Sequence, residues 1–241
     1  MSNAPALKDL KVKIYADGAD KEGMLNLYKN EWVKGFTTNP TLMAKAGIHD
    51  YMAFAKDILT VIKDRSISFE VFSDEIPEME RQAALIKTWG PNVYVKIPVI
   101  NTKGSKTNEL VKRLTKQGVQ LNVTAITTVE QCAEVCAALE GGAPSIISVF
   151  AGRVADTGRD PVPLMKECAG LCKKVEKGEL LWASTRELIN IFQADQVGCK
   201  IITVPHDIFK KLGGVGKDLY DLSLDTVKTF LKDSTAAGFK L

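Results

Sequence analysis

Several features are absent from this sequence, and each absence removes a class of protein. No run of about 18 apolar residues occurs, which a bilayer-spanning helix requires. Residues 1–13 lack the apolar core of a secretory signal, so we expect a cytoplasmic protein with no membrane partner. The sequence also lacks a large excess of charge of either sign. Its 32 Lys and Arg and 29 Asp and Glu leave a net charge of +3, which gives no reason to expect nucleic acid as a partner.

Cysteine is scarce, with five in 241 residues, and this odd number fits poorly with a full disulfide framework. Cys132 and Cys136 are four apart, as are Cys168 and Cys172, so each pair shares one face of a helix. Two such pairs could build a zinc site with four thiolate ligands, but zinc-binding cysteine pairs are usually held in turns. We therefore favour small buried residues facing a core and expect no metal.

What the sequence contains is a regular alternation of short β-branched runs and longer amphipathic stretches. The short runs predict strands at residues 12–16, 35–37, 67–72, 92–97, 119–125, 145–150, 180–183 and 200–204. The amphipathic stretches predict helices at residues 20–32, 51–63, 77–89, 105–117, 129–139, 162–176 and 186–197, a short helix up to 212, and a last helix at 219–237.

Eight strand–helix units in 241 residues predict an α/β fold, a single (β/α)8 (TIM) barrel over residues 1–241 with an extra C-terminal helix and tail at about 219–241. A doubly wound sheet is the competing fold, but the first strand ends in ADGAD (residues 16–20), not in G-x-G-x-x-G. We expect the last helix either to close the barrel mouth or to pack on a neighbouring subunit, through an apolar set of Leu222, Leu224, Val227, Phe230 and Leu231.

Lys96 is the most informative polar residue, because it lies within the otherwise apolar run 93–99. Its side chain must point into the barrel or toward the helix layer, and an ammonium is costly at either place unless it is paired. Burial favours the neutral amine, which attacks carbonyls. Lys96 is therefore a Schiff-base candidate, and a structural ion pair with Glu70 or Asp17 is the alternative.

Other polar residues also lie near strand ends, where TIM barrels carry their chemistry. Asp17 and Glu70 are acid–base candidates; the alternatives are a turn residue at Asp17-Gly18 and an ion-pair partner at Glu70. Asn122 and Thr124 are two apart, so they point to the same side of their strand and could position a water or a hydroxyl.

A second group could bind an oxyanion. Arg153, Ser184 and Arg186 follow the sixth and seventh predicted strands, and the arginine fork matches phosphate geometry. Each arginine taken alone would otherwise be a surface charge.

Six of these strand-end segments resemble the signature segments of the transaldolase family. They occur in that family's order across almost the whole chain: YAD (15–17), GFTTNPT (35–41), VKIP (95–98), NVTA (122–125), SVFAGR (148–153) and ASTR (183–186). The TTNP and KIP segments together are quite specific, and the length is similar to that of the compact transaldolases. The resemblance implies a class I aldolase barrel that moves a dihydroxyacetone unit between small-molecule sugar phosphates.

The resemblance also implies roles for single residues. Lys96 would form the Schiff base, Asp17 would be the general acid/base for the C–C bond step, and Glu70 with Thr124 would hold the catalytic water. The implied substrate-binding residues are Thr37, Asn39, Asn122, Ser148, Phe150, Arg153, Ser184 and Arg186. No cofactor or metal is implied, because the protonated imine is the electron sink.

Related activities remain open. Fructose 6-phosphate aldolases typically carry Gln where this chain has Glu70 and Tyr where it has Phe150, which favours transfer over free aldol cleavage. Val149 stands where classical transaldolases usually have Pro, and no aromatic residue follows Asp156, so a sulfonated ketose such as sulfofructose is a further alternative. A barrel that binds sugar phosphates without turnover is the third hypothesis. Compact relatives are often oligomeric, so we expect a homo-oligomer. We assign no role to His49 or His206 and expect both at exposed or capping positions.

Overall fold

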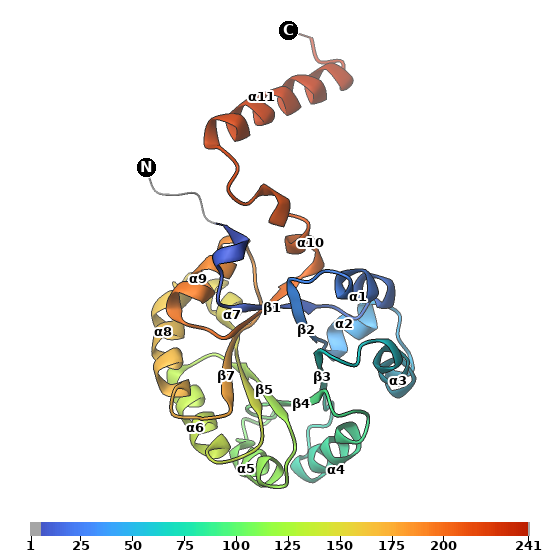
Figure 1. The fold of residues 1–241 in the computed structure, drawn as a ribbon, viewed down its shortest axis with the longest axis vertical. Coiled ribbons are helices and arrows are strands. Elements are labelled where there is room, and N and C mark those ends of the chain that lie inside the picture. The colour runs from blue at the N-terminus through green and yellow to red at the C-terminus, as the bar shows by residue number, and fades with distance from the viewer. Residues whose placement is uncertain (1–5, 241) are drawn as a thin grey trace.

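The computed structural model describes residues 6–240, which contain a closed barrel of parallel strands (Figure 1). The strands follow one another around the ring in chain order, and the first pairs with the last to close it. They are β1 (Lys13–Asp17), β2 (Val33–Thr37), β3 (Ser66–Glu70), β4 (Val93–Pro98), β5 (Leu121–Ile126), β6 (Ser145–Val149), β7 (Gly178–Trp182) and β8 (Ile201–Pro205). The predicted (β/α)8 fold is therefore confirmed.

Helices surround this ring and connect each strand to the next. They are α1 (Lys21–Tyr28), α2 (Pro40–Lys45), α3 (Tyr51–Val61), α4 (Ile76–Lys87), α5 (Asn108–Lys116), α6 (Val129–Leu139), α7 (Ala151–Ala155), α8 (Pro161–Cys172), α9 (Ile189–Val197), α10 (His206–Phe209) and α11 (Leu219–Ala236). Short 3-10 turns are η1 (Leu7–Asp9) and η2 (Leu212–Gly214). None of the helices in this part of the chain combines the length and apolar character needed to span a bilayer.

Alternate side chains of each strand point either outward, toward the surrounding helices, or inward, into the barrel. The barrel therefore has an outer core between strands and helices and an inner layer. Phe36, Phe69 and Trp182 are fully buried in the main core cluster, which includes side chains of the surrounding helices. A second, smaller cluster fills the base of the barrel interior; it contains Tyr15, Ile146, Leu181, Ala183 and Ile201, with Tyr94 and Phe150 packed against them.

The strand register then sets a polar layer above this apolar base. Lys96 lies two residues beyond Tyr94 on β4, so it faces the same interior. It pairs in register with Glu70 of β3 on one side and with Asn122 of β5 on the other. The carboxyl ends of neighbouring strands thus bring these three side chains to one rim of the barrel.

Some boundaries differ from the predicted ones for local reasons. The helix predicted from residue 186 begins at Ile189, because the side chain of Asn190 accepts hydrogen bonds from the backbone N–H groups of Arg186 and Glu187. The helix predicted from residue 105 begins at Asn108, after an antiparallel bridge between Ile100 and Lys106. Helix α7 was not predicted, because five residues are too few for a periodic pattern.

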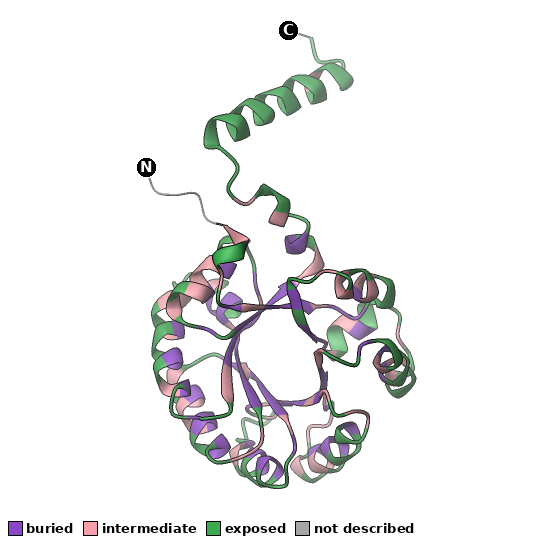
Figure 2. Cartoon of the chain, in the orientation of Figure 1, coloured by how far each residue is buried: buried purple, intermediate pink, exposed green. Residues whose placement is uncertain are grey.

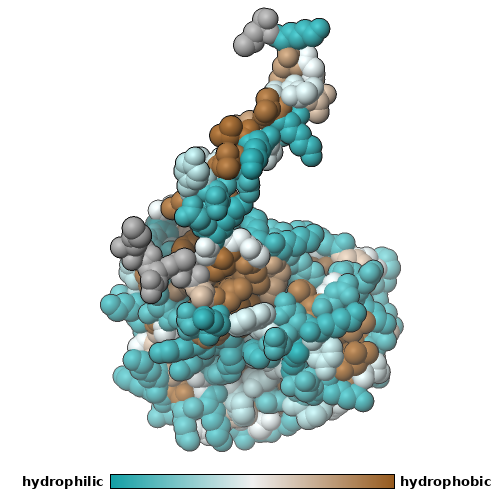
Figure 3. All heavy atoms as spheres, turned by 45° about the horizontal axis from the view of Figure 1, so that its top comes forward, coloured by the Kyte–Doolittle hydropathy of each residue, from teal (hydrophilic) through white to brown (hydrophobic). Residues whose placement is uncertain are grey.

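The C-terminal helix α11 is present as predicted, but it does not close the barrel mouth. It extends away from the barrel beyond α10 (Figure 1), and Figure 2 shows it exposed along its length. Of its residues, all described, none is buried, and Tyr220, Phe230 and Leu231 are each about two-thirds or more exposed. Hydrophobic side chains gather along one side of it (Figure 3).

The cysteines lie where a core-packing interpretation places them. All five are buried and unpaired by disulfides. Cys132 and Cys136 lie on α6, while Cys168 and Cys172 lie on α8.

Candidate active site

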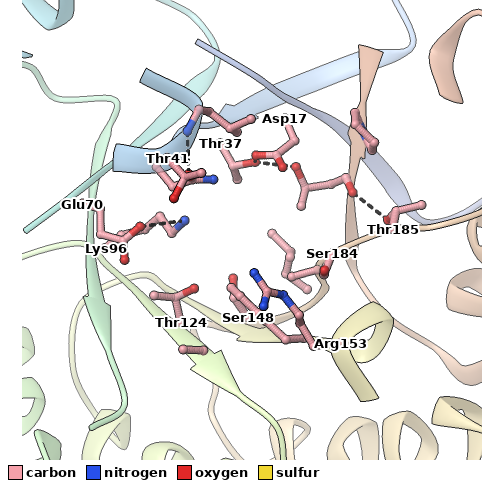
Figure 4. Close-up of a pocket in the computed structure, with 18 of the residues that line it drawn as sticks. Asp17, Thr37, Thr41, Glu70, Lys96, Thr124, Ser148, Arg153, Ser184 and Thr185 are labelled. Carbon is pink, nitrogen blue, oxygen red and sulfur yellow. Dashed lines mark hydrogen bonds and ion pairs between the residues drawn. The ribbon is translucent and has the colours of Figure 1, made fainter. Parts of the chain in front are cut away.

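A cavity of about 720 Å³ opens at the carboxyl ends of the strands. Every residue predicted for the site lines it: Asp17, Thr37, Asn39, Glu70, Lys96, Asn122, Thr124, Ser148, Phe150, Arg153, Ser184 and Arg186. Figure 4 shows Lys96 and Glu70 on one side, with Arg153 and Ser184 across the cavity from them. The structure therefore brings together side chains from six strands and from the loops that follow them.

Lys96 is the buried cation of the cavity, with 6% of its surface exposed. Its Nζ lies 3.2 Å from Oε2 of Glu70 and donates a hydrogen bond of 3.0 Å to the backbone oxygen of Thr38. Glu70 ends the neighbouring strand β3 and Thr38 directly follows β2, so the amine is held at a fixed place while its free side faces the cavity (Figure 4). Lys96 is therefore paired with Glu70 and at the same time open to the cavity, as attack on a carbonyl would require.

Asp17 faces the same space from the end of β1. The Thr37 hydroxyl donates a hydrogen bond of 2.7 Å to Oδ1 of Asp17, and Thr37 is in turn hydrogen-bonded to Thr203. Burial raises the pKa of Asp17 above its ordinary value, although the charge of Lys96 and the hydrogen bond from Thr37 act in the opposite direction. A carboxyl group with a raised pKa holds a proton more readily than a free one, which suits it to accepting and returning a proton.

The floor between these groups is a hydrogen-bonded chain across three strands. Ser148 donates to Oδ1 of Asn122 over 2.6 Å, and Nδ2 of Asn122 donates to the Ser68 hydroxyl over 2.9 Å. Thr124 lies beside this chain, and its hydroxyl, although buried, has no hydrogen-bond partner within residues 6–240. A buried hydroxyl that faces a cavity without a partner is a place for a water or a substrate oxygen.

The far side of the cavity carries the arginines. Arg186 makes a two-pronged contact with Asp156, through Nε at 3.0 Å and Nη2 at 2.5 Å, and this contact lowers the pKa of Asp156. Arg153 on α7 makes no salt bridge in the described part of the chain. Asn39 uses its Oδ1 to cap α2, through a 2.9 Å hydrogen bond from the Leu42 N–H, and still lines the cavity.

Backbone strain is concentrated at this rim. Ala125 and Ser184 both have φ of 62°, a left-handed conformation that costs non-glycine residues about 1–2 kcal/mol each. Gly152 permits a close approach of α7 to this segment, because a Cβ built there would lie 1.5 Å from the backbone oxygen of Ser184. Such strain is found where surrounding structure holds a functional group in place.

The comparison with known families decides the assignment. The sequence model of the Transaldolase/Fructose-6-phosphate aldolase family matches residues 14–241. This chain belongs to that family. A "Probable transaldolase" of Dehalococcoides mccartyi is 34% identical over 202 residues, which cover 83% of this chain and 90% of the relative. A "Probable transaldolase 2" of Listeria monocytogenes is 33% identical over 230 residues, which cover 95% of this chain and 99% of the relative.

Solved structures of other proteins share the fold of this transaldolase-family chain. A crystal structure of 3-hexulose-6-phosphate synthase has a TM-score of 0.57 at 16% identity and covers 86% of this chain and 97% of its own. A crystal structure of 2,3-dimethylmalate lyase has a TM-score of 0.54 at 12% identity and covers 97% of this chain and 86% of its own. At these identities the likeness concerns the barrel alone.

Some residues of this transaldolase-family site were not predicted. The Tyr51 hydroxyl donates to the backbone oxygen of Glu70 over 2.9 Å and accepts from its N–H over 2.7 Å, so it fixes the strand end that carries the carboxylate. Nothing in the sequence links these residues, which are 19 apart. The sequence did offer a hint for Gly152, because it directly precedes Arg153, which was a predicted site residue.

The two histidines differ in outcome. His49 is exposed, as expected. His206 was expected at an exposed or capping position, but it is half-buried and its ring lies over Gly18 and Gly23, where added Cβ atoms would come within 2.7 and 2.6 Å of it. Its charge is among the causes that lower the pKa of Asp17. The reason is the short β8–α10 connection, which turns at Pro205 and places His206 beside β1.

Proposed function

We propose that this transaldolase-family protein transfers a dihydroxyacetone unit from a ketose phosphate to an aldose phosphate through a Schiff base on Lys96. Sedoheptulose 7-phosphate and fructose 6-phosphate are the donors we expect. The observation that supports this most is the position of the Lys96 amine, buried between Glu70 and the Thr38 carbonyl and open to the cavity. A lysine that only stabilised the barrel would not need a cavity at its Nζ.

In the proposed first stage, the Lys96 ammonium gives up a proton, and the neutral amine then attacks the ketose C2 carbonyl to give a carbinolamine. Glu70 lies 3.2 Å from Nζ and can take the proton that the amine must lose. Loss of water then gives the iminium ion. Glu70 and the unpartnered Thr124 hydroxyl would hold this water, which later returns to hydrolyse the imine.

In the second stage, the carboxylate of Asp17 takes the proton of the C4 hydroxyl, and the C3–C4 bond breaks. The bonding electrons pass to the iminium ion and form an enamine on Lys96, while an aldose leaves. The enamine then attacks the carbonyl carbon of the acceptor aldose, and Asp17 returns the proton to the new hydroxyl. Asn39, Asn122 and Ser148 would hold the donor hydroxyls meanwhile.

The anionic end of the substrate would lie at the opposite rim. Asp156 binds Nε and Nη2 of Arg186 and so orients the guanidinium, whose remaining N–H groups are left for an anion. Arg153 and Ser184 also line the cavity. A phosphate is the anion that we propose, because two guanidinium groups and a hydroxyl match its three terminal oxygens. A sulfonate has the same three-oxygen shape, so a sulfonated ketose such as sulfofructose is the second candidate donor.

Borohydride trapping tests the proposed mechanism. Reduction in the presence of fructose 6-phosphate should fix a three-carbon adduct, which mass spectrometry locates on Lys96. The variant Lys96→Met should give no adduct, while Lys45→Met, which removes another lysine that lines the cavity, should give as much as the unmodified chain. The absence of an adduct with any ketose would overturn the Schiff-base mechanism.

Transfer and cleavage are distinguished by the acceptor. Steady-state rates should depend on erythrose 4-phosphate, because Phe150 and Glu70 favour transfer over release of free dihydroxyacetone. A rate independent of the acceptor would assign aldolase-type cleavage instead. If calorimetry finds sugar phosphate binding that survives Lys96→Met, and the intact protein forms no product, the barrel only binds.

Two broader properties complete the proposal. We propose a homo-oligomer in which α11 covers apolar surface of another copy; its exposed Leu222, Val227 and Phe230 support this. Sedimentation of the full chain and of Phe230→Glu tests it, since the variant should be smaller. We also propose a cytoplasmic location, supported by five thiols that carry no disulfide.

A further inference from the structure

Helices α6 and α8 carry a group of thiols outside the catalytic cavity. The two helices pack side by side on the outside of the barrel (Figure 1). Each contributes two cysteines one helical turn apart, Cys132 and Cys136 from α6 and Cys168 and Cys172 from α8. The described lining of the catalytic cavity includes no cysteine, so this group is separate from it.

The distances between the sulfur atoms are the central observation. The Sγ atom of Cys172 lies 3.6 Å from that of Cys136 and 4.0 Å from that of Cys132, and all three lie within 4.8 Å of one another. A tetrahedral thiolate site with metal–sulfur bonds of about 2.3 Å has sulfur atoms about 3.8 Å apart. The two helices therefore already hold these three sulfurs near the spacing of a ligand set.

A disulfide fits these distances less well. A sulfur–sulfur bond of about 2.05 Å requires the closest pair, Cys136 and Cys172, to approach by about 1.5 Å more between two packed helices. The third sulfur, from Cys132, would also be left beside the new bond. A metal ion needs no such approach.

The surroundings of the thiols also fit a metal ion. Cys132 is fully buried, whereas Cys136 and Cys172 keep 7% and 6% of their surface exposed, which gives an ion access from one side. Cys168 is fully buried as well, but it does not belong to the three-sulfur group.

We propose that Cys132, Cys136 and Cys172 bind a thiophilic cation of the Zn²⁺ or Cu⁺ class as thiolates. Soft thiolate ligands select these ions. Each thiol that ligates the ion releases one proton to solvent, and no electron is transferred, so the ion keeps its oxidation state. Cu⁺ is satisfied by three thiolates, whereas Zn²⁺ also takes a water as its fourth ligand. The bound ion cross-links α6 and α8, the helices that follow the strands carrying Asn122 and Ser148.

Cobalt substitution tests this site in the full-length, reduced protein. Addition of Co²⁺ should produce a thiolate-to-cobalt charge-transfer band and intense tetrahedral d–d absorption that saturate at one ion per chain, and Zn²⁺ should displace them. Cu⁺ uptake is measured in parallel by competition with a chromophoric Cu⁺ chelator. Either the cobalt spectrum or chelator-resistant Cu⁺ uptake is the expected result.

Variants locate the site. Cys136→Ala and Cys172→Ser should each lose the metal, whereas Cys199→Ala, which removes a buried thiol outside the three-sulfur group, should keep it. Circular dichroism identifies any variant that fails to fold, and the other of the pair then carries the test. Cys168→Ala, which removes a buried thiol on α8 that is not one of the three sulfurs, should also keep the metal.

Other outcomes overturn the proposal. One is a reduced chain that shows no cobalt–thiolate band and takes up no Cu⁺. Another is metal binding that persists equally in folded Cys136→Ala and Cys172→Ser, which would place the ion elsewhere. A third is a Cys136–Cys172 disulfide in the isolated protein, found by mass spectrometry after alkylation, together with no metal affinity after reduction.

Discussion

Gly152 offers a direct test of how α7 holds the far rim of the cavity. In the variant Gly152→Ala, the new Cβ would lie 1.5 Å from the backbone oxygen of Ser184 and 2.7 Å from its carbonyl carbon. A carbon and a carbonyl oxygen in contact are normally about 3.3 Å apart or more. The obstacle is backbone rather than the flexible end of a side chain, so α7 and the Ser184 segment must separate by about 1.8 Å.

The size of the effect follows from this displacement. Adding a methylene to a packed core costs about 1–3 kcal/mol, and we expect the upper end here because Ser184 is already strained at φ 62°. For a chain of this length about 3 kcal/mol corresponds to a Tm lower by about 6–12 °C. The same shift moves Arg186, two residues after Ser184, and a misplacement of about 1 Å costs about a hundredfold in rate.

Gly170→Ala is the matched control. It introduces the same methyl group on α8, where, apart from the adjacent residues and the nearby backbone of α8 itself, no described atom lies within 4 Å of the new Cβ. Alanine is favoured over glycine inside a helix by about 0.5–1 kcal/mol, so this variant should be slightly more stable than the unmodified chain. Urea denaturation followed by circular dichroism measures stability, and kcat/KM for a ketose phosphate measures function. Equal midpoints for the Gly152→Ala and Gly170→Ala variants would refute the close approach of α7 to Ser184.

Three further variants test other parts of the site. Thr124→Val removes a buried hydroxyl that has no partner within residues 6–240, so the urea midpoint should hold or rise while the transfer rate falls about a hundredfold; a lower midpoint with an unchanged rate would contradict the water-holding role. Asp17→Asn should stop C–C cleavage but still allow a borohydride-trapped donor adduct on Lys96. Because the pKa of Asp17 is raised above 3.8 on folding, the folded chain binds the proton more tightly, and its unfolding free energy falls as pH rises from 3.8 through the raised value. Denaturation at a series of pH values should therefore find Asp17→Asn more stable than the unmodified chain above that window, with the advantage vanishing below pH 3.8; the opposite order would contradict the burial argument. Arg186→Lys loses the two-pronged fork, so KM for a phosphorylated donor should rise about tenfold or more, roughly the worth of one charge-assisted hydrogen bond, whereas KM for unphosphorylated dihydroxyacetone should not change; an equal effect on both would place the anion elsewhere.

Much of the fold could be predicted because its signals are local. Strand cores such as the run around Lys96 are β-branched and short, and their regular alternation with amphipathic stretches is typical of a barrel. Once the barrel was expected, the carboxyl ends of the strands had to meet at one rim. The predicted site residues therefore came together without any knowledge of side-chain contacts.

The parts that could not be predicted depend on contacts between distant segments. Tyr51 fixes Glu70, and Asp156 orients Arg186 from 30 residues away. Neither contact leaves a periodic pattern in the sequence. The direction of α11 was beyond the sequence for a related reason, since an apolar stripe indicates that a helix has a face to cover but not the surface that covers it.

The hydrogen bonds in the floor of the cavity all run one way, and this decides which donors and acceptors are left to face the cavity. Ser148 donates its single hydroxyl proton to Asn122, and Asn122 donates one amide N–H to Ser68. Toward the cavity, Ser148 therefore offers only lone pairs, while Asn122 keeps one N–H. In the proposed sugar complex, a hydroxyl beside Ser148 would donate its proton to the Ser148 oxygen, and an oxygen beside Asn122 would accept the remaining amide N–H. In the proposed complex this polarity would favour a hydroxyl over a carbonyl or ether oxygen beside Ser148, because only the hydroxyl has a proton to donate.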